Sequence, residues 1–466
     1  MRTFRLSDAA FAALAAGRPS RETLDQLRRA QLSRHLLRLH EIVRAFGRPA
    51  PSWYAGPDAR TELADPMTAL RTAATLTALR DGQAPPPERT ASGRVLRAEH
   101  AGLALRVRLE DADPLRAALG LTPAGPLAEA DAAHWRRCLA EAWRLLVERH
   151  RPAAETLAAV LSVIVPVEPD EGAGGISATS AEAFGAVAIS APADATALAV
   201  GLLHEAQHSV LNAVRVLFDL VRPTPVLGYS PWRDDPRPPF GILHGAYAYL
   251  AVTRFWRAES GPTAAFEFAR WRAAVAGAAN GLLAGDVLTA PGRRFAGALR
   301  DEVSPWLAEP VDAAVARLAD GANAEHLARW RLRHLAVDPA AVDALVAAWE
   351  RGAAPPSIPD PAVRPAPRAL EHSDRLAVIH GTLRGLRRNP APPPGGRLRP
   401  GDDAYLRGDS GAALEAYLKE LDQVAGWTGL AMVSPRPALR AKPELVRAIH
   451  RRTGASPLRI ATWLDG

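Results

Sequence analysis

The chain has 466 residues, of which 48 % are hydrophobic and 23 % charged, and its formal net charge is +7. These values are typical of a globular protein that can bury a large core and form two or more domains. The single cysteine, Cys138, excludes a disulfide framework and a cysteine-rich zinc module, and it suits the reducing cytoplasm.

Charge and hydropathy also limit the classes of binding partner to expect. The basic residues are mostly arginine, lie along the whole chain and form no block interleaved with aromatic residues, so we expect no nucleic-acid binding. An acidic peptide or an acidic small-molecule cosubstrate fits the charge. No stretch of 18 uncharged apolar residues and no secretory signal is present, so we expect a cytoplasmic protein without a membrane span.

The first half of the chain alternates between helical and strand patterns. Apolar spacing predicts helices over residues 7–17, 20–47, 66–81 and 125–149, the second capped by Ser20. Residues 94–111 alternate apolar with polar on both sides of Ala101-Gly102, which predicts a β-hairpin. Residues 157–166 predict a helix end that leads into a buried strand, and residues 176–190 predict strands around Gly185.

An H-E-x-x-H motif, His204-Glu205-Ala206-Gln207-His208, lies in the apolar helical pattern of residues 191–222. Residues four apart share one face of a helix, so His204 and His208 can bind one metal ion. Glu205 lies beside them and can reach a metal-bound water or a polar substrate group. The alternative is a pair of core-edge histidines that are satisfied by hydrogen bonds.

Segments on both sides of this helix are candidates for the rest of the site. Phe184–Ser190 comes directly before it and is either a sheet edge that pairs with an extended peptide or a core strand. The Pro-rich loop Pro223–Phe240 follows it and either lines the pocket or is a stiff surface loop.

A third metal ligand is required, and His244 is the best choice for it. It lies near the start of a predicted apolar helix, Gly241–Glu259, where an imidazole has little packing reason to be. Glu259 and Glu267 lie in helices without a supporting local pattern. Two histidines with a third nitrogen or oxygen ligand suit Zn²⁺ and Fe²⁺ alike.

The second half is rich in helical patterns. We expect helices over the following residues: 264–283, 296–319, 325–336 and 339–351. Residues 401–423 resemble one tetratricopeptide-type helix pair, which must dock on the main body or recruit a partner. The predicted fold is α+β and mostly α-helical, with a zincin-like HExxH helix against a small sheet. We expect three parts: a catalytic domain (1–350), a Pro-rich linker (351–368) and a helical tetratricopeptide-like module (369–466).

Three stretches, LSDAAFAALAAGRPS, AFGAVAIS before the HEAQH motif, and YSPWRDDPRPPFGILHGAYAY, carry a resemblance to a known family. They resemble the bacterial HExxH-motif proteins found beside ribosomally made, modified peptides, over residues 1–350, and the C-terminal module looks like an extension that some members carry. The resemblance implies a Fe(II)- and 2-oxoglutarate-dependent peptide β-hydroxylase that uses O₂ on a precursor peptide.

The same resemblance implies roles for individual residues. His204, His208 and His244 would hold iron, which departs from the usual two-histidine, one-carboxylate set and leaves open a role for Glu205 or for Asp234 or Asp235. The distal carboxylate of 2-oxoglutarate needs a cation. The residues expected to bind this cosubstrate are Arg215, Tyr229, Arg233, Arg237 and Arg254.

Two other classes of function stay open. A zinc peptidase would use Glu205 as general base to cleave a precursor or leader peptide. However, the extended motif H-E-x-x-H-x-x-G-x-x-H fails, because Leu211 stands at its glycine and Val214 at its third histidine. A non-catalytic peptide-binding scaffold would tolerate loss of the histidines.

Overall fold

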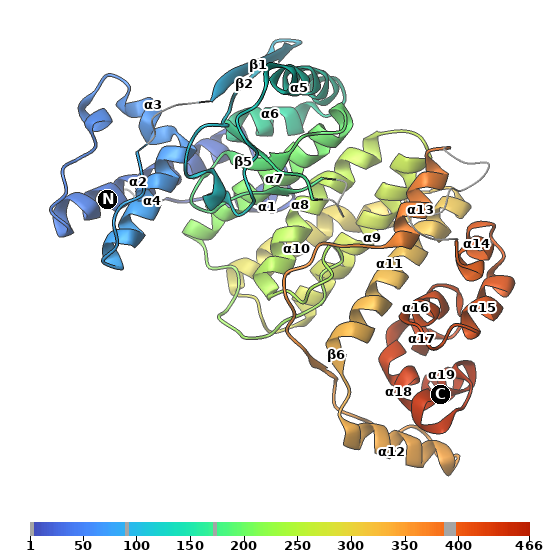
Figure 1. The fold of residues 1–466 in the computed structure, drawn as a ribbon. Coiled ribbons are helices and arrows are strands. Elements are labelled where there is room, and N and C mark those ends of the chain that lie inside the picture. Colours follow the sequence, from blue (N-terminus) through green and yellow to red (C-terminus); the bar gives the residue numbers. More distant parts are fainter. Residues whose placement is uncertain (1–3, 89–92, 171–174, 386–397) are drawn as a thin grey trace. The chain divides into compact units, whose positions relative to one another are not determined.

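The computed structural model describes the whole chain except residues 1–3, 89–92, 171–174 and 386–397 (Figure 1). The chain divides into two compact units, each described by itself. The first comprises residues 1–222, 244–258 and 282–302, and the second comprises residues 223–243, 259–281 and 303–466. The expectation of a mostly helical α+β fold with a small sheet is confirmed.

The first unit combines a five-stranded sheet with helices on both of its faces. Its helices are α1 (Asp8–Ala15), α2 (Arg21–Ala45), α3 (Ala59–Ala64), α4 (Pro66–Arg80), α5 (Glu129–Arg149), α6 (Arg151–Val160), α7 (Ala195–Leu217), most of α8 (Pro239–Ala258) and most of α10 (Ala290–Val303). Its strands are β1 (Arg94–His100), β2 (Leu103–Leu109), β3 (Val163–Val167), β4 (Ser177–Ala178) and β5 (Ala186–Ser190). The predicted Ser20 cap is present, since its side chain accepts the N–H of Thr23.

The strand order β1-β2-β3-β5-β4 makes a mixed sheet. The predicted hairpin is confirmed, with β1 antiparallel to β2. Strands β2, β3 and β5 are parallel, and β4 runs antiparallel to β5. Alternate residues enter different cores: Val187 and Ile189 pack in the cluster that holds α5 and α7, whereas Ala186 and Ala188 pack in the one that holds α4. Both faces of the central strands are therefore covered, which explains their continuous apolar sequence.

The interpretation of Phe184–Ser190 as an exposed substrate rail is wrong. Strand β5 is buried at every residue and has β3 on one side and β4 on the other, so the core-strand alternative holds. The sheet edge on this side is β4, a strand of two residues. Apolar content alone could not distinguish an interior strand from an edge, because the pairing partners are remote in sequence.

The second unit is helical apart from a short strand pair. Its helices are most of α9 (Pro262–Ala284), α11 (Ala313–His334), α12 (Pro339–Glu350), α13 (Asp374–Leu383), α14 (Pro400–Leu406), α15 (Ser410–Leu418), α16 (Val424–Val433), α17 (Pro437–Ala441), α18 (Pro443–Thr453) and α19 (Pro457–Asp465). Its strands β6 (Leu335–Ala336) and β7 (Ala362–Val363) pair antiparallel, so the predicted linker holds a strand.

Two predicted helices of this half have different bounds. The chain leaves α10 at Val303, makes a 3₁₀ turn over Ser304–Ala308 and starts α11 at Ala313. Pro305 and Pro310 break the helical pattern because proline has no N–H to donate. Asp312 then caps α11 by accepting the N–H groups of Ala314 and Val315, and the helix continues without interruption to His334.

The division into units differs from the expected boundaries at 350 and 369. One core of the second unit joins Phe266, Leu318 and Leu345 to Tyr417 and Trp427 of the C-terminal part. The tetratricopeptide-like pair, α14 and α15, packs against α16 in the same unit. The pair thus buries its face by docking, as its sequence requires.

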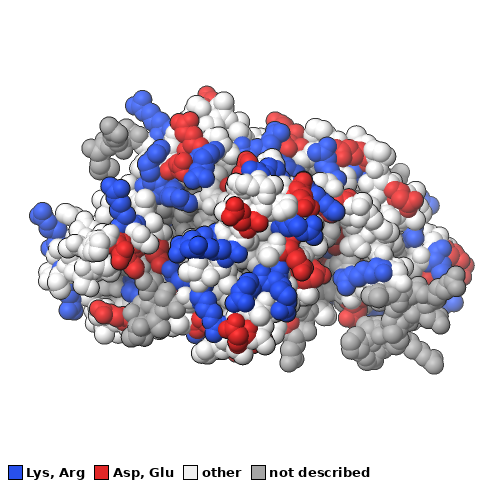
Figure 2. Space-filling view, turned by 90° about the horizontal axis from the view of Figure 1, so that it is seen from above, with Lys and Arg blue, Asp and Glu red and all other residues white. Residues whose placement is uncertain are grey.

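Surface charge is mixed. On the face drawn in Figure 2, basic and acidic side chains are interspersed. Many arginines are used in ion pairs; Arg34 and Arg38, for example, both bind Glu182. In the described part of the chain, no helix has both the length and the apolar character that crossing a bilayer requires.

Gly185 offers a test of the sheet. Its φ is +92°, and a Cβ there would lie 2.4 Å from the carbonyl oxygen of Val160. We expect Gly185→Ala to destabilise the protein by about 3 kcal/mol, because backbone strain and a steric clash add. The measurement is the midpoint of urea-induced unfolding. The matched control is Gly297→Ala in α10, where nothing lies within 4 Å; this change should be neutral or stabilising by up to about 1 kcal/mol. Equal midpoints for the two variants would contradict the described packing.

Candidate metal centre

Helix α7 presents the two motif histidines on one face. It begins where Asp194 accepts the N–H of Ala197, at 2.8 Å, and its other faces are buried by residues such as Leu198, Leu202 and Val210. The rings of His204 and His208 lie 4.5 Å apart, centroid to centroid, at 88° to each other. The predicted i, i+4 arrangement is therefore present, with both rings partly accessible to solvent.

Helix α8 brings two more aromatic side chains to this face. The ring of His244 stacks on that of His208, with centroids 3.8 Å apart and planes 9° from parallel. The ring of Tyr249 meets that of His204 edge-on, at 5.1 Å. Like the motif histidines, His244 and Tyr249 are only partly buried. Three imidazoles thus form one cluster that solvent-borne groups can reach.

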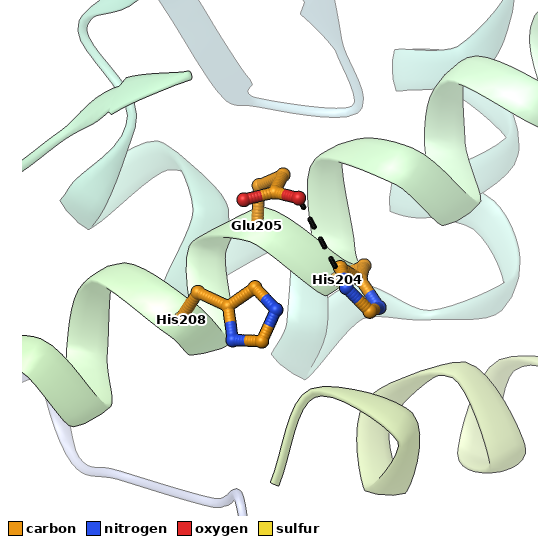
Figure 3. A group of neighbouring side chains, drawn as sticks. All are labelled: His204, Glu205 and His208. Carbon is orange, nitrogen blue, oxygen red and sulfur yellow. Dashed lines mark ion pairs between the residues drawn. The ribbon is translucent and has the colours of Figure 1, made fainter. Parts of the chain in front are cut away.

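Glu205 lies on the buried side of the cluster. Its side chain is 2 % exposed, and its Oε1 is 3.9 Å from Nε2 of His204 (Figure 3). The hydroxyl of Ser177, on β4, donates a hydrogen bond to the same oxygen at 2.6 Å. The edge strand of the sheet therefore orients the acidic residue of the motif.

Burial keeps the imidazoles neutral. Desolvation lowers the pKa of His204 to about 4. The pKa of His208 is held well below its ordinary value, first by burial and then by the nearby His244 and His204. A neutral imidazole offers a nitrogen lone pair without first losing a proton, so both side chains are in the form that binds metal at neutral pH.

The donor set fits a metal ion. Ligand atoms of His204, Glu205 and His208 all lie within 4.8 Å of one another. Nδ1 of His208 is buried and has no hydrogen-bond partner in the part of the chain that the structure describes. Buried polar atoms are rarely left unsatisfied, so this nitrogen points to a missing partner. Imidazole and carboxylate donors suit Zn²⁺ and Fe²⁺.

The expected residues of the loop lie in the second unit, and ion pairs within that unit hold them. Arg233 and Arg237 both bind Asp235. Tyr229 bonds through its hydroxyl to Nδ1 of His326 at 2.7 Å, and burial raises its pKa. Asp234 pairs with Arg329, His326 and Arg333. The expected binding of 2-oxoglutarate by Tyr229, Arg233 and Arg237 stays a prediction.

The other expected cations lie in the first unit. Arg215 is exposed near the end of α7, two turns beyond His208. Arg254 is about 15 Å along α8 from His244, since each helical residue rises 1.5 Å. Its guanidinium donates to the carbonyl groups of Ala16 and Gly17 and to Glu302, so it serves packing in this structure.

The rejected ligand Glu267 is also engaged elsewhere. It is held in the second unit by His380 and by the indole N–H of Trp271. His244 as the third ligand stays a prediction, since the group whose ligand atoms lie within 4.8 Å of one another is His204, Glu205 and His208.

Two residues of the cluster were not predicted. Ser177 lies in a short polar stretch with no signal that connects it to Glu205, 28 residues away. Tyr249 lies five residues beyond His244, and the sequence predicts only that it belongs to an apolar helix. Helical spacing places it within about two turns of His244, so the distance along α8 was the one available signal.

Two comparisons of the chain with known proteins found no match. The chain matches no model of a known protein family, and no curated protein matches it. The resemblance to HExxH-motif peptide hydroxylases stays a prediction, which rests on the quoted segments.

The shielded imidazoles predict a pH dependence of the metal-free protein. The pKa of His204 is lower in the folded than in the unfolded chain, so the unfolded chain takes up a proton first as the pH falls. The stabilising contribution is full above pH 6.5 and is lost between about pH 6.5 and pH 4, by up to about 3 kcal/mol for this residue. Urea unfolding in EDTA at pH 7 and pH 5 measures it. His204→Gln should flatten the dependence, whereas His40→Gln, at an exposed position outside the cluster, should leave it unchanged. If His204→Gln and the wild type lose the same stability between these pH values, the shielding is contradicted.

Proposed function

We propose that this protein is a Fe(II)- and 2-oxoglutarate-dependent hydroxylase that acts with O₂ on the β-carbon of side chains in a ribosomally made precursor peptide. The observation that carries the proposal is the cluster of His204 and His208 with Glu205, whose ligand atoms lie within 4.8 Å of one another, and the ring of His244 that stacks on His208. The choice of iron and 2-oxoglutarate among metal chemistries rests on the resemblance of the flanking segments. A zincin-like placement of the motif helix beside a sheet edge belongs to the same proposal.

His204 and His208 would hold the metal, and His244 would complete the set. The two motif histidines are fixed by one rigid helix, and His244 contacts His208 ring to ring. Bound iron would supply the O₂ chemistry that protein side chains lack. The three histidines are only partly buried, which would leave an approach for the cosubstrate and the peptide.

Glu205 would act through its orientation. Ser177 fixes Oε1, and the carboxylate lies against the ring of His204. From there it can accept a hydrogen bond or a proton from a polar group that approaches the metal side of His204. Burial strengthens this interaction, because little water competes for the carboxylate.

A zinc peptidase is the second candidate. The observation that favours it is the position of Glu205 beside His204, where a general base of an H-E-x-x-H peptidase would lie. This reading requires the carboxylate to activate a water and a peptide bond to be cleaved.

The two candidates differ in metal and product. Purified protein is reconstituted anaerobically with Fe(II) or with Zn²⁺, mixed with 2-oxoglutarate and then exposed to O₂. We expect a weak visible charge-transfer band with Fe(II) that is absent in His204→Ala, and succinate after O₂ is admitted. Tight zinc with no band and no succinate would sink the hydroxylase proposal. Cleavage of a precursor peptide by the zinc form would then establish the peptidase.

The ligand set gives a separate prediction. His204→Ala and His208→Ala should abolish stoichiometric metal binding, and His244→Ala should weaken it at least tenfold, because a lost ligand removes a metal–nitrogen bond. Glu205→Gln should retain the metal if Glu205 is not a ligand. Metal content after dialysis against a chelator series measures this. Retention in His244→Ala together with loss in Glu205→Gln would assign the third ligand to the carboxylate instead.

A further inference from the structure

A cavity of about 490 Å³ lies next to α7, the helix that carries the motif histidines, inside the first unit. It is lined by the turn after α1, the start of α2, α6, and the facing sides of α7 and α8. Leu203, Ala206 and Gln207 supply the α7 wall, and Ala251 and Phe255 lie on the α8 wall. The volume falls in the range of specific ligand pockets, roughly 300–1,000 Å³. None of the metal-site histidines lines it, so it is a second, separate site.

The cavity holds one polar group that needs a partner. Gln207 is 6 % exposed, and its Oε1 is buried without a hydrogen-bond partner among the described residues. A buried carbonyl oxygen left unsatisfied is costly, so the position favours a ligand that donates an N–H or O–H group. Most of the remaining inner wall is apolar, with leucine, alanine and phenylalanine side chains beside the buried His150 and Thr156.

The wall toward solvent is basic. Four arginines line the cavity, Arg18, Arg21, Arg149 and Arg254, against one carboxylate, Glu155. Arg18 and Arg254 both pair with Glu302, Arg21 pairs with Asp25 on its own helix, and Glu155 pairs with Arg151. The side chains of Arg18 and Arg21 are 64 % and 66 % exposed, so a group entering from solvent can reach both despite their ion pairs with Glu302 and Asp25. An anionic ligand complements this wall.

We propose that this cavity binds a peptide segment in which an apolar side chain is flanked by acidic residues. A peptide supplies all three complements at once: the apolar side chain for the inner wall, a backbone N–H for Oε1 of Gln207, and carboxylates for the arginines. A simple aliphatic acid has no donor for Gln207. The inference rests on the proposed function in that the substrate is a peptide, and it adds a docking site apart from the metal.

The test measures binding to the full chain in EDTA, so that it does not depend on the metal. The probe is a fluorescein-labelled Glu-Glu-Leu-Phe-Glu-Glu peptide, followed by fluorescence anisotropy. Its matched control peptide has lysine in place of glutamate, and decanoate serves as a non-peptide competitor. We expect the acidic peptide to bind at least tenfold more tightly than the basic one and to be displaced only weakly by decanoate.

Variants locate the bound peptide. Arg21→Glu combined with Arg149→Glu should weaken binding at least tenfold, and Arg97→Glu, at an exposed position on β1 outside the cavity, should change it less than twofold. Gln207→Met keeps the size of the side chain and should weaken binding about fivefold through loss of one hydrogen bond. Ala153→Phe, at a half-buried lining position, should block binding by filling the space. Urea midpoints establish that each variant is folded.

Each contrary result has a definite meaning. The proposal would be overturned if the acidic and basic peptides bound equally well, or if no binding occurred at millimolar protein. It would also be overturned if Arg97→Glu and the cavity variants had the same affinity for the peptide. Decanoate binding as tightly as the peptide would assign the cavity to small amphipathic acids instead. Peptide binding in protein that forms no Fe(II)–2-oxoglutarate band would leave the docking site standing and the proposed hydroxylase wrong. If Ala153→Phe does not fold, Gln207→Met and the peptide pair still decide.

Discussion

The contact between α7 and β5 is the constraint on which the candidate metal centre depends. Gly201 lets the two elements approach closely, since a Cβ at this position would lie 2.8 Å from Cδ1 of Ile189. Leu198, Leu202 and Ala206 pack in the same core as Val187 and Ile189. Because the helix is held at this depth, rotation or sliding would move His204 and His208 together and expose apolar surface, which costs about 25 cal/mol per Å². The i, i+4 pair is therefore rigid in direction as well as in spacing.

The same contact explains why Glu205 faces inward. When His204 and His208 point toward α8, the next residue along the helix turns toward β4, about 100° away. There Ser177 meets it with a hydroxyl. A buried carboxylate without such a donor would be strongly disfavoured, so the two-residue strand β4 matters more than its length indicates. The sheet thus sets the position of α7, and its strand β4 orients Glu205 through Ser177.

The sequence correctly predicted those features that depend on residues close together in the chain. The H-E-x-x-H spacing, the Ser20 cap and the hairpin turn at Ala101-Gly102 all depend on residues within a few positions of one another, and each is present. The pairing of Ser177 with Glu205, the interior place of β5 and the shared core of Phe266 with Trp427 depend on residues 28 or more positions apart or on strand order. Hydrophobic periodicity carries no information about such partners. His244 could be singled out from the sequence because an imidazole at the start of an apolar helix has little packing reason to be there.

Helix α7 serves two surfaces at once, and this has a mechanical consequence. Gln207 faces the cavity, whereas its neighbour His208 faces His244. A ligand that entered the cavity would press on a helix already held by the sheet, so it would not displace the imidazoles. Under the two proposals made here, the cavity would bind a peptide and the candidate metal centre would carry the chemistry, each without disturbing the other. A docked segment would raise the local concentration of the target residue at the metal without requiring a tight fit there.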